Sequence, residues 1–233
     1  MSDIKDMERL RAAEAAAALV EPGMRLGLGT GRAAFAFVRA VGARVAGGLA
    51  LPPAVSTSSA TEALAREHGI TVCDLLAADA PTRVDLAVDG ADEIDDALRL
   101  IKGGGGSLLR EKIVAHMAAR FVVIAESSKR VAELGAFALP VEVVPFGWQA
   151  TSASVAEALG VAPVLRRSEG AVRVTDNANY ILDCPMGRIA DPEGVAARLS
   201  GIVGVVEHGL FLTEADETIV GMGDTVERRQ RAR

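Results

Sequence analysis

The sequence predicts an α/β protein in which helices cover a parallel sheet and a small α+β lobe is inserted toward the C-terminal end. The 233 residues are 50% hydrophobic but only 3% aromatic, which suits layers packed through Ala, Val, Leu and Ile. Strand-like and helix-like stretches alternate up to about residue 135, as in units whose strands run parallel. Beyond that residue, several strand-like runs accompany two helix-like segments.

The first half of the chain predicts a helix followed by repeated strand, turn and helix units. Apolar residues recur at steps of three and four, which predicts an amphipathic helix, at Met7, Leu10, Ala13, Ala17 and Val20. Ser2 or Asp3 is its expected cap. Residues 24–28 predict a buried strand that runs into a glycine turn, and residues 33–45 return to helical composition. Further strands are expected at 54–55, 70–72, 84–88 and 121–125.

The second half predicts the smaller lobe. Strand-like runs occupy 138–144, 163–167, 171–175, 180–184 and 202–206, with helices near 151–159 and 192–199. This order resembles a split βαβ unit and predicts a ferredoxin-like lobe over residues 135–206, with residues 1–134 and 207–233 forming the larger domain. We expect 209–212 and 218–222 to rejoin the first sheet, and 227–233 to form a solvated, fraying tail.

Composition argues against nucleic acid and membranes as partners. The chain has 25 Lys and Arg against 31 Asp and Glu, a formal charge of −6, and no apolar run approaches the roughly 18 residues of a membrane span. We therefore expect a soluble, cytoplasmic protein. Cys73 and Cys184 have no CxxC spacing and the three histidines are scattered, so we expect buried or reduced thiols and no metal centre.

The glycine turn at 27–32 is the first candidate site. Its glycines let the backbone approach an anion, and the following helix presents unpaired N–H groups, so a phosphate fits there. Residues 29–34 also match the dinucleotide pattern G-x-G-x-x-A, but the acidic residue expected about 20 positions later is missing from residues 52–56. A tight structural turn is the remaining alternative.

The run Asp89-Gly90-Ala91-Asp92-Glu93 is the second candidate site, with three carboxylates just past an apolar strand. Open α/β sheets bind ligands at the C-terminal ends of their strands. Crowded carboxylates raise one another's pKa, so that a pair can share a proton or hold the hydroxyls of a sugar. An Asp-Gly turn followed by a solvated acidic loop is the alternative.

The run Lys102-Gly103-Gly104-Gly105-Gly106 opens the third candidate site. Four consecutive glycines are costly to order, so something must approach that backbone closely. A helix beginning near residue 107 places Glu111 one turn in, on the side of Leu108, with Arg110 and Lys112 turned elsewhere. Glu111 as half of a surface ion pair is the alternative.

Together these motifs resemble those of the type A family of ribose-5-phosphate isomerases. The resemblance rests on Gly-Leu-Gly-Thr-Gly at 27–31, Asp-Gly-Ala-Asp-Glu at 89–93 and Lys-Gly-Gly-Gly-Gly-x-Leu-x-Arg-Glu-Lys at 102–112. It continues in the family's order through 126–129, 139–145, 174–177 and 206–211, and so covers nearly the whole chain.

The resemblance implies a Rossmann-like domain with an inserted α+β lobe, assembled as a homodimer or homotetramer. It implies interconversion of ribose 5-phosphate and ribulose 5-phosphate in the pentose phosphate pathway, without metal or cofactor. Carried over by position, the catalytic residues are Glu111 as the base, Asp89 and Lys102. The residues implied to bind the substrate are Thr30, Gly31, Arg32, Ala33, Asp89, Gly90, Ala91, Asp92, Lys102, Gly103, Gly104, Gly105 and Lys129.

The chemistry of this isomerisation asks for the same residue types. One base on one face of an enediolate can carry a proton between C1 and C2, which suits Glu111. Charge that develops on the carbonyl oxygen needs a fixed cation or donors, which Lys102 and the N–H groups of Gly103 to Gly105 can supply. Asp89 is expected to assist ring opening by shuttling a hydroxyl proton.

The sequence departs from the family after Gly31, where many members carry Ser-Thr and this chain carries Arg32-Ala33. A guanidinium thus replaces two hydroxyls, and three interpretations stay open. The guanidinium binds phosphate through its planar fork of donors, or it faces solvent, or it indicates a different pentose phosphate as the substrate. Arg9 likewise stands where some relatives have Lys, and it is left outside the predicted site.

Two other classes of function use the same fold, sugar-phosphate-sensing lobes of bacterial transcription regulators and coenzyme A transferases. A regulator needs a DNA-binding module, and only about 23 residues precede the first predicted strand. A transferase would place a nucleophilic Glu near the glycine loops, but it does not account for Asp89 and Lys102 together.

Overall fold

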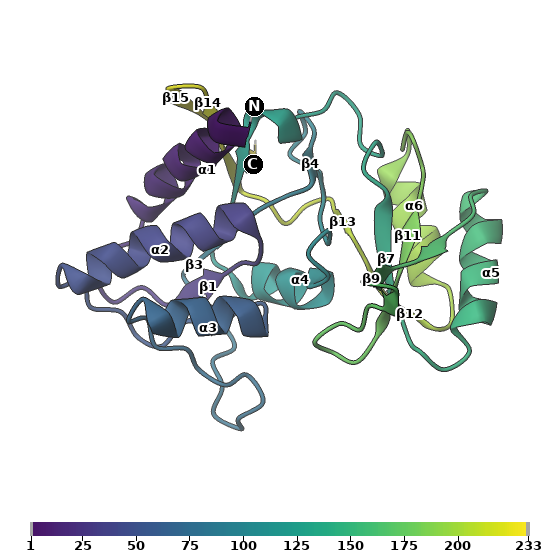
Figure 1. The fold of residues 1–233 in the computed structure, drawn as a ribbon, viewed down its shortest axis with the longest axis horizontal. Helices are drawn as coiled ribbons and strands as arrows, with labels where there is room; N and C mark the ends of the chain where they lie inside the picture. Colours follow the sequence, from purple (N-terminus) through teal and green to yellow (C-terminus); the bar gives the residue numbers. More distant parts are fainter. Residues whose placement is uncertain (1, 232–233) are drawn as a thin grey trace. The chain divides into compact units, whose positions relative to one another are not determined.

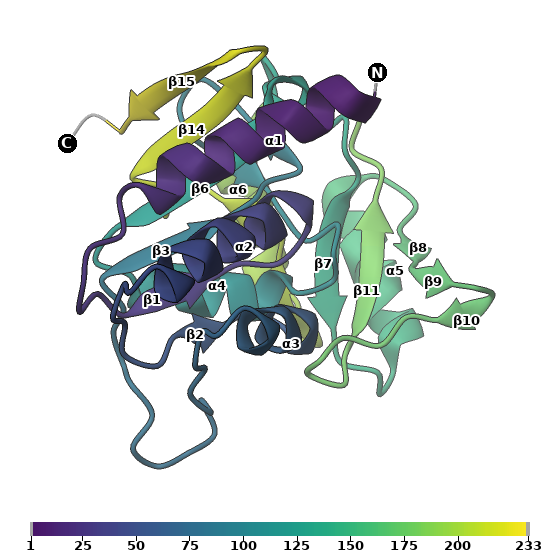
Figure 2. The same cartoon turned by 60° about the vertical axis from the view of Figure 1, so that its left-hand side comes forward.

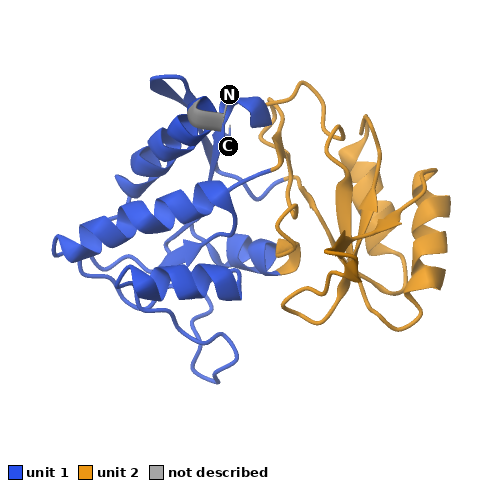
Figure 3. Cartoon of the chain, in the orientation of Figure 1, with its two compact units in different colours: residues 1–91, 110–129, 213–233 blue, residues 92–109, 130–212 orange. Residues whose placement is uncertain are grey.

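Two compact units make up the structure, a computed structural model that describes residues 2–231 and their side chains from residue 4 (Figure 3). The units consist of residues 1–91, 110–129 and 213–233 in the first, and residues 92–109 and 130–212 in the second. Each unit has a sheet and a hydrophobic core of its own. The chain passes from one unit to the other inside two of the motifs, after Ala91 and after Leu109.

A six-stranded sheet forms the first unit (Figure 1). Its strands, all labelled in Figure 2, lie in the order β15-β14-β6-β3-β1-β2. The strands are β1 (Leu26–Leu28), β2 (Val55–Ser56), β3 (Leu86–Asp89), β6 (Phe121–Glu126), β14 (Glu217–Met222) and β15 (Thr225–Gln230). All neighbours are parallel except β14 and β15, which are antiparallel. The predicted α/β class with a parallel sheet is confirmed.

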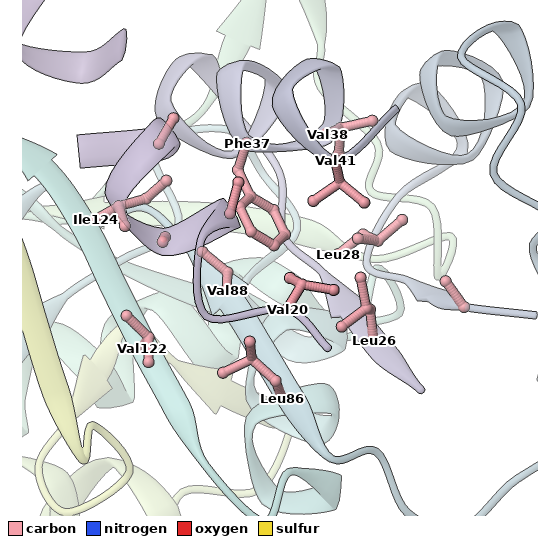
Figure 4. Close-up of a cluster of buried hydrophobic side chains, with 14 of the residues drawn as sticks. Val20, Leu26, Leu28, Phe37, Val38, Val41, Leu86, Val88, Val122 and Ile124 are labelled. Atoms are coloured by element: carbon pink, nitrogen blue, oxygen red, sulfur yellow. The ribbon is translucent and has the colours of Figure 1, made fainter. Parts of the chain in front are cut away.

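Helices cover both faces of this sheet. They are α1 (Ser2–Ala17), α2 (Arg32–Ala46), α3 (Ser59–Glu67) and α4 (Leu108–Met117). α1 and α2 pack on one face, as Figure 2 shows, and α3 packs beside α2. Leu26 and Leu28 join Phe37 of α2 in the core (Figure 4). Because side chains alternate along a strand, Gly27 faces the other side, where a Cβ would lie 2.6 Å from Val114 of α4.

The helix α1 buries most of the face predicted for it but differs from the prediction around Leu10. Most of the predicted apolar positions are buried, but Leu10 is 49% exposed. Glu8 and Arg9 are buried in its place, at 4% and 5% exposure. They can be buried because Glu126, at the end of β6, and Ser127, directly after it, offer them polar partners. The expected caps, Ser2 and Asp3, lie outside the residues whose side chains are described.

The second unit contains a four-stranded antiparallel sheet in the order β12-β7-β11-β8. Its strands are β7 (Leu139–Val143), β8 (Val164–Leu165), β11 (Tyr180–Cys184) and β12 (Val205–His208), and two short strands, β9 (Arg167–Ser168) and β10 (Ala171–Val172), pair with each other. The helices α5 (Trp148–Leu159) and α6 (Pro192–Ser200) share a core with this sheet, in which Val141, Val155 and Leu199 are fully buried.

A three-stranded antiparallel sheet in the order β13-β5-β4 also belongs to the second unit. Its strands are β4 (Glu93–Ile94), β5 (Leu100–Ile101) and β13 (Leu210–Phe211). The prediction that residues 209–212 rejoin the first sheet is therefore wrong, because Leu210 pairs with Ile101. These pairings group residues 92–109 with the second unit. The domain boundaries expected from the sequence placed the same residues in the larger domain, and those boundaries stay a prediction.

Three further predictions differ from the structure, two of them in the kind of element and one only in its bounds. Residues 227–230 are not a fraying tail but part of β15, which pairs with β14 along its length, while 232–233 lie outside the described residues. Residues 70–72 contribute only an isolated bridge from Val72 to Ala54. The strand expected at 202–206 begins only at residue 205, after Gly204 with its φ of 93°.

Candidate active site

The turn between β1 and α2 holds Asp89 of the neighbouring strand. The N–H groups of Thr30 and Gly90 donate to Asp89 Oδ1 at 3.0 and 2.7 Å. A Cβ at Gly29 would lie 2.1 Å from that oxygen, so this approach requires glycine. Asp89 is 3% exposed and is the last residue of β3, at the edge where parallel sheets bind ligands. The structure thus joins the glycine turn to the first carboxylate of the acidic motif.

Hydroxyl groups surround the Thr30 side chain. Its Oγ1 lies within hydrogen-bonding distance of Thr57 Oγ1 at 2.6 Å, Ser58 Oγ at 2.8 Å and Thr61 Oγ1 at 3.0 Å. Ser58 also caps α3 by accepting the N–H of Thr61. None of these three residues was predicted to belong to the site, although the hydroxyl-rich run at 56–59, directly after a strand, was a signal for Thr57 and Ser58.

Arg32 and Ala33 form the first turn of α2. Gly31, the residue before them, has a φ of 101°, which favours glycine. Ala33 is buried, whereas Arg32 is exposed. Arg32 lines a pocket of about 600 Å³ between α1 and α2, together with Arg9 and Arg39. The residue that departs from the family pattern therefore borders an arginine-rich pocket.

Lys129 ends a short 3-10 helix, η1 (Ser127–Lys129), which is tied to α1. Glu8 Oε2 accepts hydrogen bonds from Ser127 N–H at 3.0 Å and from its hydroxyl at 2.8 Å. Arg9 donates to both oxygens of Glu126, the residue before η1, through Nε at 3.0 Å and Nη2 at 3.1 Å. The position of Lys129 thus depends on two charged residues of α1.

The carboxyl groups of Glu8 and Glu126, which link α1 to η1 and to β6, both have a pKa lowered from its ordinary value. Burial raises the pKa of Glu8, but hydrogen bonds from Gly223 N–H and from Ser127 lower it by more. Burial also raises the pKa of Glu126, but the hydrogen bond and charge of Arg9, a backbone hydrogen bond and the charge of Lys129 together lower it by more. Both groups are therefore ionised at neutral pH and able to hold η1.

Glu111 lies in the first turn of α4 and is 4% exposed, so it is not a surface residue. Leu108, one turn earlier, is fully buried, as expected for the same side of the helix. Lys112 is also buried, at 6% exposure, although the helical spacing predicted that it turns elsewhere. The exposed side of this helix is marked instead by Ile113, at 48%.

In the second unit, Asp92 holds the polyglycine turn at residues 103–106. Gly104 N–H donates to Asp92 Oδ2 at 2.7 Å, and a Cβ at Gly104 would lie 2.7 Å from Asp92 Oδ1. Gly103 and Gly106 have φ of 108° and 87°, a region that L side chains rarely adopt. Conformation or a close contact thus requires glycine at three of these four positions.

Lys102 enters this turn from β5 and is 2% exposed. Its N–H donates to Gly209 O at 2.9 Å, and its Nζ lies 5.4 Å from the centre of the Phe211 ring, within cation–π distance. A Cβ at Gly209 would lie 2.2 Å from Lys102 O. The segment around β13, which was expected in the other sheet, therefore fixes the lysine.

Glu93, the third carboxylate of the acidic motif, has a structural role. Its two oxygens accept the N–H groups of Gly135 and Phe137, each at 2.6 Å. Asp89 and Asp92, in contrast, each hold a glycine turn. The motif therefore combines two carboxylates that shape the candidate site with one that anchors a loop.

Within the described part of the chain, no three His, Cys, Asp or Glu side chains gather in a group suited to a metal ion. Both cysteines are free thiols, Cys73 partly exposed and Cys184 buried, as the sequence predicts. None of the helices described has the length and apolar character that crossing a membrane requires.

Comparison with known proteins gives a consistent result. The sequence profile of the family described as ribose 5-phosphate isomerase A (phosphoriboisomerase A) matches residues 53–225. The chain is 51% identical over 228 residues to a ribose-5-phosphate isomerase A of Methylorubrum extorquens, covering 94% of each chain. It is 48% identical over 225 residues to that of Cereibacter sphaeroides, covering 94% of this chain and 89% of the relative. A solved structure of a D-ribose-5-phosphate isomerase in complex with phospho-erythronic acid superposes with a TM-score of 0.90 at 35% identity, covering 97% of this chain and 99% of the other.

Proposed function

The chain belongs to the ribose 5-phosphate isomerase A family and is a ribose-5-phosphate isomerase, and we propose that it acts through an enediolate with Glu111 as the base. The substrates of this reaction are D-ribose 5-phosphate and D-ribulose 5-phosphate, in the non-oxidative branch of the pentose phosphate pathway. The observation that carries the assignment is 51% identity to a ribose-5-phosphate isomerase A over 94% of the chain.

Glu111 is the proton-transferring group. It takes the proton from C2 of the open-chain aldose and returns it to C1 of the enediolate, so one carboxylate serves both half-reactions. Its 4% exposure supports this role, because a base shielded from water exchanges the abstracted proton less readily.

Lys102 stabilises the charge that develops on the substrate oxygens, aided by backbone N–H groups of the polyglycine turn. A buried ammonium group costs no reorganisation when the charge appears, and its attraction is stronger away from water. Because Gly104 N–H already donates to Asp92, we assign the donation to the oxygens to Gly103 and Gly105. Asp92 receives the sugar hydroxyls.

Asp89 and the first glycine turn serve the remaining steps. Asp89 assists ring opening by moving a hydroxyl proton, and it contacts the sugar together with Gly90 and Ala91. Residues 30–33 and Lys129 bind the phosphate end, where a helix N-terminus and a cation suit an anion. Arg32 adds a guanidinium in place of the hydroxyls that many relatives carry.

Assembly and location complete the proposal. We infer a homodimer or homotetramer acting in the cytoplasm, with a small sugar phosphate as partner and with neither nucleic acid nor membrane. Sedimentation of the purified protein measures the number of subunits. If the active protein sediments as a monomer at the concentrations used for catalysis, the proposed assembly is contradicted.

The reaction is tested by incubating chelator-treated protein with ribose 5-phosphate and following ketose formation. Arabinose 5-phosphate and unphosphorylated ribose are the comparisons, and ribose 5-phosphate should give the highest kcat/KM. A preference for arabinose 5-phosphate would assign another pentose phosphate, as Arg32-Ala33 allows. Absence of ketose from either phosphorylated aldose would favour a sugar-phosphate sensor. Activity lost with the chelator and restored by a divalent cation would contradict the metal-independent scheme.

The enediolate is tested by running the reaction in deuterium oxide. A base that exchanges its proton with solvent introduces deuterium at C1 of ribulose 5-phosphate. A direct hydride shift keeps the original hydrogen however long the reaction runs. A shielded base exchanges only a fraction of the protons in each turnover, so deuterium is followed at equilibrium over many forward and reverse turnovers, where it should accumulate. A product that still carries no deuterium after these many turnovers would contradict the enediolate.

A further inference from the structure

Two arginines of the second unit bind the carbonyl groups of the polyglycine turn. Arg166 Nη1 donates to Gly103 O at 2.7 Å and to Gly104 O at 3.3 Å. Arg173 Nη2 donates to Gly105 O. Three successive carbonyls of a segment that is intrinsically flexible are thus held by charged donors.

Arg166 is itself held firmly. Its side chain is 11% exposed, its Nε donates to Asp183 Oδ2 at 2.9 Å, and its Nη2 donates to Asp183 Oδ1. Its backbone N–H donates to Ile181 O at 2.8 Å, and its carbonyl accepts the N–H of Arg173 at 3.0 Å. Both Ile181 and Asp183 belong to β11, so the guanidinium is supported by the four-stranded sheet.

The planarity of the peptide bond turns these carbonyl contacts into control of the N–H groups. In a trans peptide the carbonyl of one residue and the N–H of the next point in opposite directions, and the described chain has no cis peptide bond. Holding Gly103 O therefore directs Gly104 N–H, which donates to Asp92, and holding Gly104 O directs Gly105 N–H. A positive charge at the carbonyl also polarises the peptide and strengthens its N–H as a donor.

We propose that Arg166, held by Asp183, is a positioning residue that orients the peptides of Gly103 to Gly105 and the Asp92 carboxylate for the isomerisation. The inference rests on the function proposed above, and it gives the four-stranded sheet a role in catalysis. The sheet supplies a rigid support for donors that are carried by a glycine turn. Arg166 acts through the turn, so its loss should affect the transition state more than ground-state binding.

The test compares Arg166→Ala with Arg167→Ala. Arg167 is the next residue and is exposed, and its Nη1 donates to Gly170 O at 3.0 Å within its own turn, so its replacement removes the same charge without touching the polyglycine turn. We expect Arg166→Ala to lower kcat by about 10- to 100-fold, the scale of a small misplacement of catalytic groups, while KM changes less than about three-fold. Arg167→Ala should keep both constants within about two-fold of the parent.

Two further variants guard against a folding defect. Arg166→Lys keeps the charge but cannot span Gly103 O and both Asp183 oxygens, so it should fold and still lose part of kcat. Asp183→Asn keeps the shape of the anchor and should lose kcat in the same way. Added guanidinium ion should restore part of the kcat of Arg166→Ala and leave Arg167→Ala unchanged.

Amide hydrogen exchange of residues 102–106 provides a readout that does not depend on activity. The Arg166 variants should exchange faster there than Arg167→Ala, at equal thermal stability. If the Arg166 variants match Arg167→Ala in kcat, or in this exchange, the positioning role is overturned. A parent protein without isomerase activity would instead overturn the proposed function, and the exchange rates would still decide whether Arg166 orders the turn.

Discussion

Arg9 and Glu126 form a two-pronged ion pair, in which Nε and Nη2 of the guanidinium donate to the two carboxylate oxygens at 3.0 and 3.1 Å. Their side chains are only 6% and 5% exposed. The pair joins α1 to the end of β6, directly before the η1 turn that carries Lys129. A buried pair of this kind is costly to break, because the remaining charge is left in a poorly solvated place.

Glu126→Gln should lower the free energy of unfolding at pH 7 by about 1.5 to 3 kcal/mol, the range for a hydrogen bond to a charged group. The pKa of Glu126 is lowered in the folded protein, so its contribution is present above the ordinary value of 4.5 and is lost as the pH falls through the lower folded value. Urea unfolding at pH 7 and at acid pH measures the free energy of unfolding of parent and variant. The difference between the two free energies should become smaller as the pH falls.

The matched control is Glu62→Gln, which removes an exposed pair with Arg66 whose side chains are 43% and 57% exposed. It should cost under about 1 kcal/mol at pH 7. An equal cost for both variants, or a Glu126 difference that stays constant into acid, would argue against the buried pair as the source of stability.

Glu111→Gln should lower kcat by on the order of 10² to 10⁴, because the amide keeps the shape of the side chain but cannot accept the proton. Binding of phospho-erythronic acid, the ligand in a relative's structure, should change little. Glu157→Gln, on the exposed side of α5, is the control and should behave as the parent. A kcat for Glu111→Gln within a few-fold of the parent would move the base to another residue, with Asp89 next.

Lys102→Ala should lower kcat by on the order of 10² to 10³, because the proposed mechanism assigns to this cation the stabilisation of charge in the transition state. Lys102→Met tests the same loss while keeping an unbranched side chain of similar length at this position, without the ammonium that lies over the Phe211 ring. Steady-state kinetics measures the effect of each variant on kcat, and thermal unfolding measures its effect on stability. A loss of kcat at unchanged stability is then due to the missing charge and not to altered packing. If Lys102→Met retains the parental kcat, the ammonium group has no part in the chemistry.

Arg32→Ala should mainly raise KM for ribose 5-phosphate, because the phosphate is remote from C1 and C2 and is bound equally in the ground and transition states. The loss should be about 1.5 to 3 kcal/mol, and Arg32→Ser combined with Ala33→Thr should recover part of it. Arg39→Ala, in the same pocket, is the control. A KM within about two-fold of the parent, under about 0.5 kcal/mol, would leave Arg32 without a phosphate role.

Cys184 should resist alkylation in the native protein. Burial raises the pKa of its thiol to about 12, and the charge of Asp183 adds to the shift, so the reactive thiolate is scarce at pH 8. Cys73, which is partly exposed, should react first. Mass spectrometry after alkylation measures both sites, with urea-unfolded protein as the control in which both react. Equal labelling of both in the native protein would contradict the burial.

The sequence by itself determined the class of the fold and the places of its turns. Alternation of strands and helices is a local pattern, and it predicts the parallel sheet without any knowledge of partners. The glycine turns at 27–32 and 103–106 also stand out in the sequence, as places where the backbone is approached closely or turns tightly. The structure shows the close approach, with Asp89 against Gly29 and Asp92 against Gly104. Short motifs were therefore enough to predict these two glycine turns and the carboxylates that contact them as parts of one candidate site.

Tertiary structure alone decided which polar side chains are buried and what they hold. Arg9 meets Glu126 across 117 residues, and Arg166 meets Gly103 across 63 residues. Leu10 is exposed while its neighbour Arg9 is buried, the reverse of what hydrophobicity predicts. A charged residue can be buried only where a distant partner compensates its lost hydration, and that partner is absent from any local stretch of the sequence. Arg166 and Arg167 are adjacent and chemically identical, and only the fold places one of them against the polyglycine turn.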